Sequence, residues 1–189
     1  EFSEYLGKVR KSTGFPEYLL CTTGKNRKER VLECNEKLGG ILRFTASVQS
    51  LDKEVLANVK RSNISTTQFE KVRDLVTEKG LRTHTDIILG LPGETLASYL
   101  DGLRTVFNQG FNEIITFNCR MLGGTELNTP ESRLKYGIRS KFRPLQLGSG
   151  EYADRIAIDC EEVIIETNSI TEEEIQSMRP LNWLLFLCW

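Results

Sequence analysis

A rhythm of short apolar runs and helical patterns between residues 17 and 119 is the feature that most constrains how this chain can fold. Apolar runs bounded by turn signals are typical of strands, whereas apolar residues that recur every three or four positions are typical of amphipathic helices. Strands that alternate with helices imply parallel pairing through right-handed crossovers. The sequence therefore predicts an α/β fold built on a parallel sheet.

The predicted element order of this part is β-α-β-α-α-β-α-β. Its strands are expected over residues 18–23, 41–48, 82–89 and 113–119. Its helices are expected over residues 26–38, 53–59, 65–79 and 94–109. Because ligands of such sheets gather at the carboxyl ends of the strands, the candidate binding segments are 22–25, 47–50, 90–94 and 120–124.

The rhythm breaks in the last third of the chain. Residues 136–150 contain glycine, proline and basic residues and are expected to form a loop, and residues 155–167 are expected to form a long strand. A helix is predicted over residues 170–178, and Thr171 and Glu174 form a capping box at its start.

The charge balance also changes along the chain. Residues 1–150 carry 23 Lys and Arg against 17 Asp and Glu, whereas residues 151–189 carry 2 against 9. The final stretch, residues 181–189, is apolar and is expected to form an amphipathic helix or strand whose partner is missing. We therefore expect two structural units, residues 1–128 and a truncated C-terminal α+β extension over residues 129–189.

Composition excludes several classes of protein. The chain is 39% hydrophobic and 27% charged with a net charge of −1, unlike a disordered chain, a collagen or a multi-span membrane protein. The balanced charge gives no indication of nucleic-acid binding. No signal peptide is recognisable, and the apolar C-terminal run is shorter than the ~20 residues of a membrane span. Because the sequence begins without Met, we expect a cytoplasmic piece of a longer protein.

The five cysteines form no C-x-x-C or C-x-x-x-C pair. They stand at positions 21, 34, 119, 160 and 188. An odd, scattered set predicts reduced thiols, mostly buried in strands, rather than ligands of zinc or of an iron–sulfur cluster.

The most informative segment is Asp86–Thr95, which reads DIILGLPGET. A buried strand ends at Gly90, turns through Pro92 and Gly93, and enters a helix at Glu94. Glycine permits close approach of a ligand to the backbone, and a new helix offers free N–H groups. A compact turn without a ligand remains the alternative. A carboxylate such as Asp86 inside an apolar strand is costly unless it is paired.

Polar groups also follow the preceding strand, in the segment Ser47–Ser50. Gln49 offers an amide donor and acceptor that suit a ribose or an amino-acid head group, although a polar loop start is the alternative. Arg61 follows a short predicted helix, and its guanidinium suits the capture of a carboxylate, although a lone arginine is more often a surface residue.

Taken together, these sequence segments resemble the second half of a radical S-adenosylmethionine (SAM) barrel. The resemblance rests on Ser47–Ser50, on Lys60–Arg61, on Asp86–Thr95 and on FNCRMLGGTEL at residues 117–127. It covers roughly residues 1–128, and it implies strands three to six of a partial (β/α)6 barrel. The tail from Cys160 to Thr167 and the Glu-rich helix after it resemble the C-terminal extension of radical SAM proteins that carry a cobalamin-binding domain.

The resemblance implies roles toward SAM for residues on two of the strands. Ser47 and Gln49 fall where the family's fourth strand contacts the ribose or methionine part of SAM. Arg61 falls where some members bind the SAM carboxylate. Asp86 falls where some members bind the amino-acid or ribose group.

Four further positions match residues that contact the adenine of SAM in the family. Ile88 and Gly90 fall on the adenine motif of the fifth strand. Met121 and Leu122 fall on the backbone contact after the sixth strand. These roles bind and position SAM, so the resemblance implies no catalytic acid, base or metal ligand in this chain.

The departure from the family concerns the cluster. The C-x-x-x-C-x-x-C loop that binds the [4Fe–4S] cluster is absent, as is the glycine-rich end of the second strand, and both are expected upstream of Glu1. This chain alone should therefore bind part of SAM without radical chemistry. The parent protein would cleave SAM reductively, with flavodoxin or ferredoxin as reductant and with cobalamin as a further cofactor, to modify or methylate an unknown substrate.

Two rival hypotheses stay open. One is a phosphate-binding βα-barrel without SAM that uses Lys25 and the turn at Gly90. The other is a partner-binding module that uses the basic first part and the acidic tail. His84 is expected to be a core residue, and Arg120 to face a substrate or an edge salt bridge. The acidic residues 161, 162 and 172–174 are expected to form a solvated face.

Overall fold

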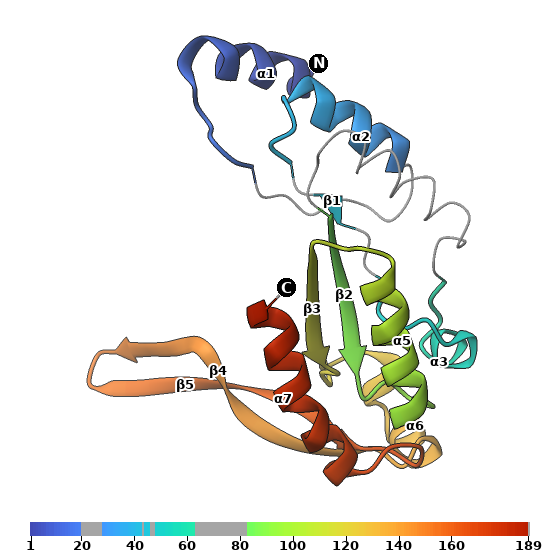
Figure 1. Ribbon diagram of the computed structural model, residues 1–189. Coiled ribbons are helices and arrows are strands. Elements are labelled where there is room, and N and C mark those ends of the chain that lie inside the picture. The colour runs from blue at the N-terminus through green and yellow to red at the C-terminus, as the bar shows by residue number, and fades with distance from the viewer. Residues whose placement is uncertain (20–27, 43, 46–47, 63–82, 189) are drawn as a thin grey trace.

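The computed structural model describes residues 1–19, 28–42, 44–45, 48–62 and 83–188 (Figure 1). The helices are α1 (Phe2–Thr13), α2 (Lys28–Lys37), α3 (Lys53–Asn58), α5 (Leu96–Asn108), the 3-10 helix η1 (Glu126–Asn128), α6 (Pro130–Lys135) and α7 (Glu172–Cys188). The strands are β1 (Phe44–Thr45), β2 (Thr83–Leu89), β3 (Glu113–Asn118), β4 (Arg139–Tyr152) and β5 (Arg155–Glu166). The predicted helix over 65–79, and most of the predicted strand over 18–23, lie outside the described residues.

The predicted parallel sheet is confirmed where it is described. Strands β1, β2 and β3 are neighbours in that order, and both pairs are parallel. Isolated parallel bridges join Leu19 to Leu42 and Gln49 to Ile87, which extends the pairing beyond the two residues of β1. All the carboxyl ends of these strands therefore lie at one edge, as the alternating pattern predicts.

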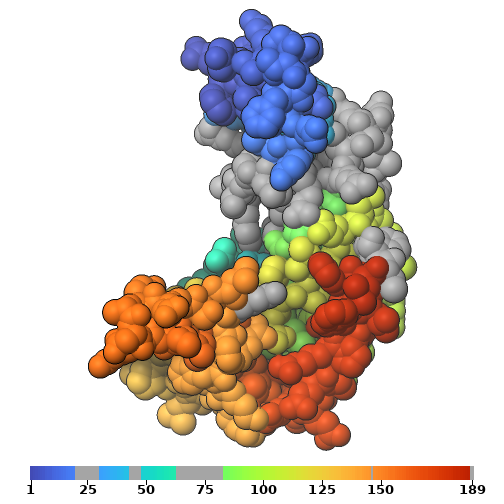
Figure 2. Space-filling view, turned by 90° about the vertical axis from the view of Figure 1, so that its left-hand side faces the viewer, coloured from blue at the N-terminus to red at the C-terminus, as the bar shows by residue number. Residues whose placement is uncertain are grey.

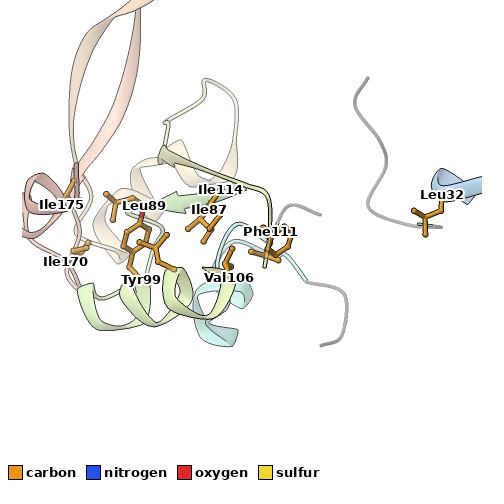
Figure 3. Close-up of a cluster of buried hydrophobic side chains, with 11 residues drawn as sticks. Leu32, Ile87, Leu89, Tyr99, Val106, Phe111, Ile114, Ile170 and Ile175 are labelled. Carbon is orange, nitrogen blue, oxygen red and sulfur yellow. The ribbon is translucent and has the colours of Figure 1, made fainter. Parts of the chain in front are cut away.

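A hydrophobic cluster lies between the sheet and two helices (Figure 3). Ile87 and Leu89 project from β2 into this cluster, where they meet side chains of α5 and α7. The members in or directly beside β2, α5, β3 and α7 are Ile87, Leu89, Tyr99, Leu103, Val106, Phe111, Ile114, Ile170 and Ile175. Because successive strand residues point to opposite faces, His84, Asp86 and Ile88 face away from α5.

Helix α5 follows the expected local rules. Thr95 is its N-cap, and its hydroxyl accepts the Ser98 N–H at 3.1 Å in a capping box. Gly110 follows the helix with φ 74°, a left-handed conformation that glycine adopts without the penalty of a side chain. The helix is therefore confirmed close to its predicted bounds of 94–109.

The prediction of a loop over 136–150 is wrong. Residues 139–152 form β4, which pairs antiparallel with β5 in a long hairpin that projects from the body (Figure 1). Its glycine and proline residues mark an irregular stretch, because the register shifts between Pro144 and Ser149. Such residues are tolerated here because β4 is an edge strand.

The hairpin base is hydrogen-bonded to the segment that follows β3. The Met121 N–H donates to the Glu162 carbonyl at 2.9 Å, and the Ile164 N–H donates to the Cys119 carbonyl at 2.9 Å. Ile170 and Ile175, which follow the hairpin, are buried in the cluster that covers the sheet. The extension therefore shares both backbone pairing and a core with the α/β part.

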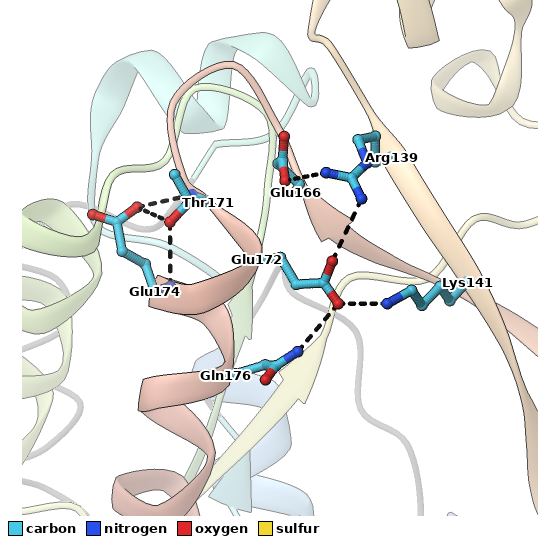
Figure 4. A network of polar contacts seen from close by, with 7 residues as sticks. All are labelled: Arg139, Lys141, Glu166, Thr171, Glu172, Glu174 and Gln176. Atoms are coloured by element: carbon cyan, nitrogen blue, oxygen red, sulfur yellow. Dashed lines mark hydrogen bonds and ion pairs between the residues drawn. The ribbon is translucent and has the colours of Figure 1, made fainter.

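The capping box at the start of α7 is confirmed. The Thr171 N–H donates to Glu174 Oε2 at 2.8 Å, and the Glu174 N–H donates back to Thr171 Oγ1 at 3.3 Å (Figure 4). Neighbouring Glu172 does not belong to a merely solvated face, because it accepts from Lys141 Nζ at 2.6 Å and lies 3.5 Å from Arg139 Nη2. These bonds attach the helix start to β4.

The apolar C-terminal run continues α7 as a helix to Cys188, well beyond the predicted end at residue 178. One side of helix α7, with Met178, Leu181 and Leu185, packs against the core cluster. The other side exposes Trp183, Leu184, Phe186 and Leu187. Among the helices that the structure describes, none has both the length and the apolar character that crossing a bilayer requires.

We expect Gly7→Ala to destabilise the packing of α1 on α2. A Cβ at Gly7 would overlap the Lys37 carbonyl oxygen, so the backbone must move. Overpacking of this kind costs about 1–3 kcal/mol, to be measured by denaturant unfolding and by hydrogen exchange of α1. Gly102→Ala in α5 is the control: no atom lies within 4 Å of its Cβ, so it should stabilise by up to about 1 kcal/mol. Equal effects of the two changes would contradict the prediction.

Candidate functional site

A pocket of about 690 Å³ opens at the carboxyl edge of the parallel sheet. Its walls come from the residues that follow β1 and α3, from the ends of β2 and β3, and from the η1–α6 segment. This volume lies within the range of about 300–1,000 Å³ that is usual for small-molecule sites. The edge at which the sequence predicts ligands is therefore hollowed.

The pocket brings together four of the eight predicted site residues. Gln49, Arg61, Ile88 and Leu122 all line it. Asp86, Gly90 and Met121 belong to the same strands and loops but do not line it, and Ser47 lies outside the described residues. The individual roles of all eight toward SAM stay predictions.

Two backbone hydrogen bonds to β2 fix Gln49 at the edge of the sheet. Its N–H donates to the Asp86 carbonyl and its carbonyl accepts the Ile88 N–H, each at 2.8 Å. Its φ is 62°, a left-handed value that is uncommon for a residue with a side chain and that persists only where the surroundings impose it. The fold therefore places this amide at the pocket wall at a cost in backbone energy.

Arg61 reaches the pocket because of the way in which α3 ends. Lys60 follows the helix with φ 53°, and its N–H donates to the Ala57 carbonyl at 3.1 Å. The Arg61 N–H then donates to the Leu56 carbonyl at 2.8 Å, which completes a Schellman motif. The helix end is also tied to the turn after β2, because Asn58 Nδ2 donates to the Pro92 carbonyl at 3.1 Å.

The two adjacent cations differ in their partners. Lys60 Nζ lies 2.7 Å from a Glu126 carboxylate oxygen on η1. Arg61 is exposed, and no ion pair joins it to another residue in the part of the chain that the structure describes. Apolar side chains make up much of the remaining wall: Ile88, Leu91, Phe117, Leu122 and Leu127. The pocket thus combines an apolar wall with a guanidinium that can pair with an anionic group.

Asp86 is paired, as its place inside an apolar strand requires. Its Oδ1 lies 2.7 Å from Nε2 of His84, which is only 4% exposed and is the core histidine that the sequence predicts. His84 Nδ1 lies 3.5 Å from Glu113 Oε2 on the neighbouring strand. The imidazole thus lies between two carboxylates on the face of the sheet opposite α5.

Glu94 is a residue that the sequence reasoning missed. Its side chain is buried, with 1% of the residue exposed, and Oε2 accepts the Gly90 N–H at 3.1 Å. Burial raises its pKa to about 8, although hydrogen bonds with Gly90, Leu91 and Ser50 act in the opposite direction. Glu94 therefore ties the turn after β2 to Ser50, the neighbour of Gln49. The available signal was an acidic residue directly after Pro-Gly, where a strand passes into a helix.

Salt bridges join the base of the β4–β5 hairpin to α6, which forms part of the pocket wall. Arg133 of α6 donates to Glu162 Oε1 at 2.6 Å and to Asn128 Oδ1 at 2.7 Å. The hydrogen bonds from Ser140 and Arg133 hold the pKa of Glu162 below its usual range. Glu162 was expected on a solvated face, and that expectation is wrong, because its side chain is only 14% exposed.

Arg120 and Glu161 are likewise paired. Arg120 Nε lies 3.0 Å from Glu161 Oε2, and Arg143 Nη2 lies 2.6 Å from Glu161 Oε1. Arg120 thus forms the salt bridge that was one of its two predicted roles, while it also lines the pocket. The Glu161 side chain is 15% exposed, so the expectation of a solvated residue is wrong here too.

The cysteines do not gather in the part of the chain that the structure describes. Cys34 lies in α2, Cys119 is buried after β3, and Cys160 is exposed in β5, and all three are free thiols. The expectation of thiols mostly buried in strands is therefore wrong for Cys34 and Cys160. Burial raises the pKa of the Cys119 thiol to about 12. No three metal-ligating side chains cluster among the described residues.

Known proteins of similar sequence are methyltransferases and methylthiotransferases. The chain is 29% identical over 178 residues to 2-(S-pantetheinyl)-carbapenam-3-carboxylate methyltransferase of Streptantibioticus cattleyicolor, with 92% of the chain and 26% of that protein covered. It is 28% identical over 177 residues to the cobalamin-dependent radical SAM methyltransferase TokK of Streptomyces tokunonensis, with the same coverage of 92% and 26%. A tRNA-2-methylthio-N(6)-dimethylallyladenosine synthase of Finegoldia magna is 28% identical over 141 residues, which are 73% of the chain and 31% of that protein.

A solved structure shares the fold. The radical SAM methyltransferase TsrM of Kitasatospora setae, with tryptophan and a SAM analogue bound, superposes on 67% of this chain and 25% of its own with a TM-score of 0.50 and 15% identity. No protein-family model matches the chain. The chain spans about a quarter of the length of the curated methyltransferases that it matches. The resemblance to radical SAM proteins, including cobalamin-dependent ones, is thus confirmed.

Proposed function

From this likeness to radical SAM methyltransferases, we propose that the chain supplies the C-terminal half of a SAM-binding barrel to a longer, cobalamin-dependent enzyme. Residues 1–128 would form strands three to six of a partial (β/α)6 barrel, and residues 129–189 its C-terminal extension. The parent would cleave SAM reductively to modify or methylate a substrate that the chain does not identify. The chain's coverage of about a quarter of its relatives supports this assignment.

The single observation that carries the proposal is the pocket at the carboxyl edge of the parallel sheet. It joins Gln49, Arg61 and Ile88, which come from three separate segments. SAM combines an apolar aromatic base with polar ribose and a charged amino-acid group. The wall around Ile88 suits the base, and the guanidinium of Arg61 suits the carboxylate.

Each residue would bind or orient rather than react. Gln49 and Ser47 would hydrogen-bond the ribose or methionine part, and Asp86 the amino-acid or ribose group. Ile88 and Gly90 would meet the adenine at the end of β2, where the φ of 87° at Gly90 is a left-handed value that glycine adopts without the penalty of a side chain. Met121 and Leu122 would complete the adenine side, although the Met121 N–H already donates to Glu162.

The [4Fe–4S] cluster does not fit this chain. Its cysteines are scattered in sequence, and the described ones lie in separate elements. We therefore assign the cluster ligands to another part of the parent protein. When bound there, a reduced cluster supplies the electron for cleaving SAM, and flavodoxin or ferredoxin would be its reductant.

The test is equilibrium binding of SAM to the full-length protein that carries this chain, after anaerobic reconstitution of its cluster. We expect Gln49→Ala to weaken SAM binding by about tenfold, the effect of one lost hydrogen bond to a charged or strongly polar group, without loss of iron.

Lys25→Ala is the matched control, because the rival phosphate-binding hypothesis needs this residue and the SAM hypothesis does not. Retained SAM affinity in K25A, with reduced affinity in Q49A, supports the proposal. A protein that binds inorganic phosphate through Lys25 and does not bind SAM would favour the rival.

A further inference from the structure

We infer that His84 is a positioning residue for SAM, which acts through Asp86 without touching the ligand. This inference rests on the proposed function, because it assigns a support to one of the side chains proposed to bind SAM. It adds a role to the single histidine of the chain, which sequence reasoning treats only as a core residue.

The geometry around His84 is that of a clamped side chain. Nε2 lies 2.7 Å from Asp86 Oδ1, and the two residues are two positions apart on the same face of β2. An ionised carboxylate can only accept hydrogen bonds, so with Asp86 ionised the Nε2–H group is the donor and Asp86 Oδ1 the acceptor. On the other side of the ring, Nδ1 lies 3.5 Å from Glu113 Oε2 and makes no hydrogen bond among the described residues.

His84 is too deep in the sheet to reach a ligand in the pocket. It is 4% exposed and does not line the pocket, whereas the Asp86 side chain is 25% exposed. The backbone of Asp86 is also joined to pocket-lining Gln49, whose N–H donates to the Asp86 carbonyl at 2.8 Å. We therefore take Asp86 as the route by which His84 acts on a ligand.

The physical effect is preorganisation. A free aspartate samples several rotamers, and fixing one of them on binding costs free energy. The charge-assisted bond from His84 fixes the carboxylate before the ligand arrives, and such bonds are stronger than neutral ones. Removing the donor should therefore weaken SAM binding while the stability of the core changes less.

The experiment measures SAM affinity of the full-length protein in a matched set of variants. Gln places its amide near the position of Nε2, and Asn places its amide near that of Nδ1. We expect His84→Leu and His84→Asn to weaken SAM binding about tenfold. We expect His84→Gln to restore most of the affinity. Glu113→Gln is the control and should stay within about twofold of the parent, because Glu113 lies on the other side of the ring, 3.5 Å from Nδ1, and the proposal gives it no role toward SAM.

A double-mutant cycle separates positioning from general damage. If His84 acts through Asp86, His84→Leu should add no further loss in an Asp86→Asn background, whereas independent effects add. Normal SAM binding by H84L, or equal losses in H84L and H84Q, would overturn the inference while a weakened D86N left the proposed site intact. Normal SAM binding by D86N would overturn the site assignment and the inference together. His84→Asn gives the same decision if the leucine variant does not fold.

Discussion

Replacing Arg61 by alanine in the full-length protein is expected to weaken SAM binding by about ten- to a hundredfold. The reason is that Arg61 is the pocket-lining cation proposed to meet the SAM carboxylate, and a hydrogen bond to a charged group contributes about 1.5–3 kcal/mol. It is exposed at the end of α3 and has no ion pair among the residues that the structure describes. Equilibrium titration with SAM measures the loss, and the iron content of the protein should not change.

Lys60→Ala is the matched control for this prediction. Lys60 is adjacent, carries the same charge and lines the same pocket, but its ammonium is bound to Glu126 at 2.7 Å. We expect K60A to change SAM affinity by no more than about threefold, because exposed ion pairs contribute little. Arg61→Lys should be intermediate, since it keeps the charge and loses the bidentate geometry. Equal losses in R61A and K60A would show a general effect of charge rather than a specific contact.

The second large effect concerns Glu94 and the pH dependence of folding. Burial raises the pKa of Glu94 from 4.5 to about 8. The folded state therefore binds this proton more tightly than the unfolded state does. Its contribution to stability is fully present below pH 4.5, is lost as the pH rises toward 8, and is constant above that. A shift of this size corresponds to a loss on the order of 5 kcal/mol across the window.

Glu94→Gln should remove this dependence. Glutamine stays neutral, keeps an acceptor for the Gly90 N–H and offers a donor toward Ser50. We expect E94Q and the parent to be similarly stable near pH 4.5, and E94Q to be more stable by several kcal/mol above pH 8. Urea unfolding at a series of pH values measures the difference.

Glu151→Gln serves as the control for that series, because Glu151 is exposed near the tip of the β4–β5 hairpin. Its unfolding curves should follow those of the parent at every pH. If the free-energy difference between the parent and E94Q does not vary with pH, Glu94 is not protonated in the folded protein and the prediction is wrong.

Local patterns were enough to predict much of the α/β part. The apolar run that became β2 and the glycine after α5 each carry their information within a few residues. The segment around Gly90 also indicated the edge of the sheet at which the pocket lies. Such features depend on backbone geometry and periodicity, which a sequence displays directly.

The features that were missed depend on partners distant in sequence. Pro144 and its glycine neighbours indicated a loop, yet β4 pairs with β5, and Arg143 meets Glu161 and Ser140 meets Glu162 across the hairpin. No local sequence pattern predicts such cross-strand pairs. Glu94 was likewise overlooked, since its burial follows from the packing of several elements around one turn.

The backbone bonds between the hairpin base and the residues after β3 have a consequence for how the molecule can be divided. A chain that ended at residue 128 would lose the acceptor of the Met121 N–H and the donor to the Cys119 carbonyl. It would also lose Ile170 and Ile175 from the core that backs the sheet. Unsatisfied buried backbone groups and an emptied core are both costly. The pocket edge of the sheet and the C-terminal extension therefore share backbone bonds and a core, so we expect a chain cut after residue 128 to unfold more easily than the whole chain.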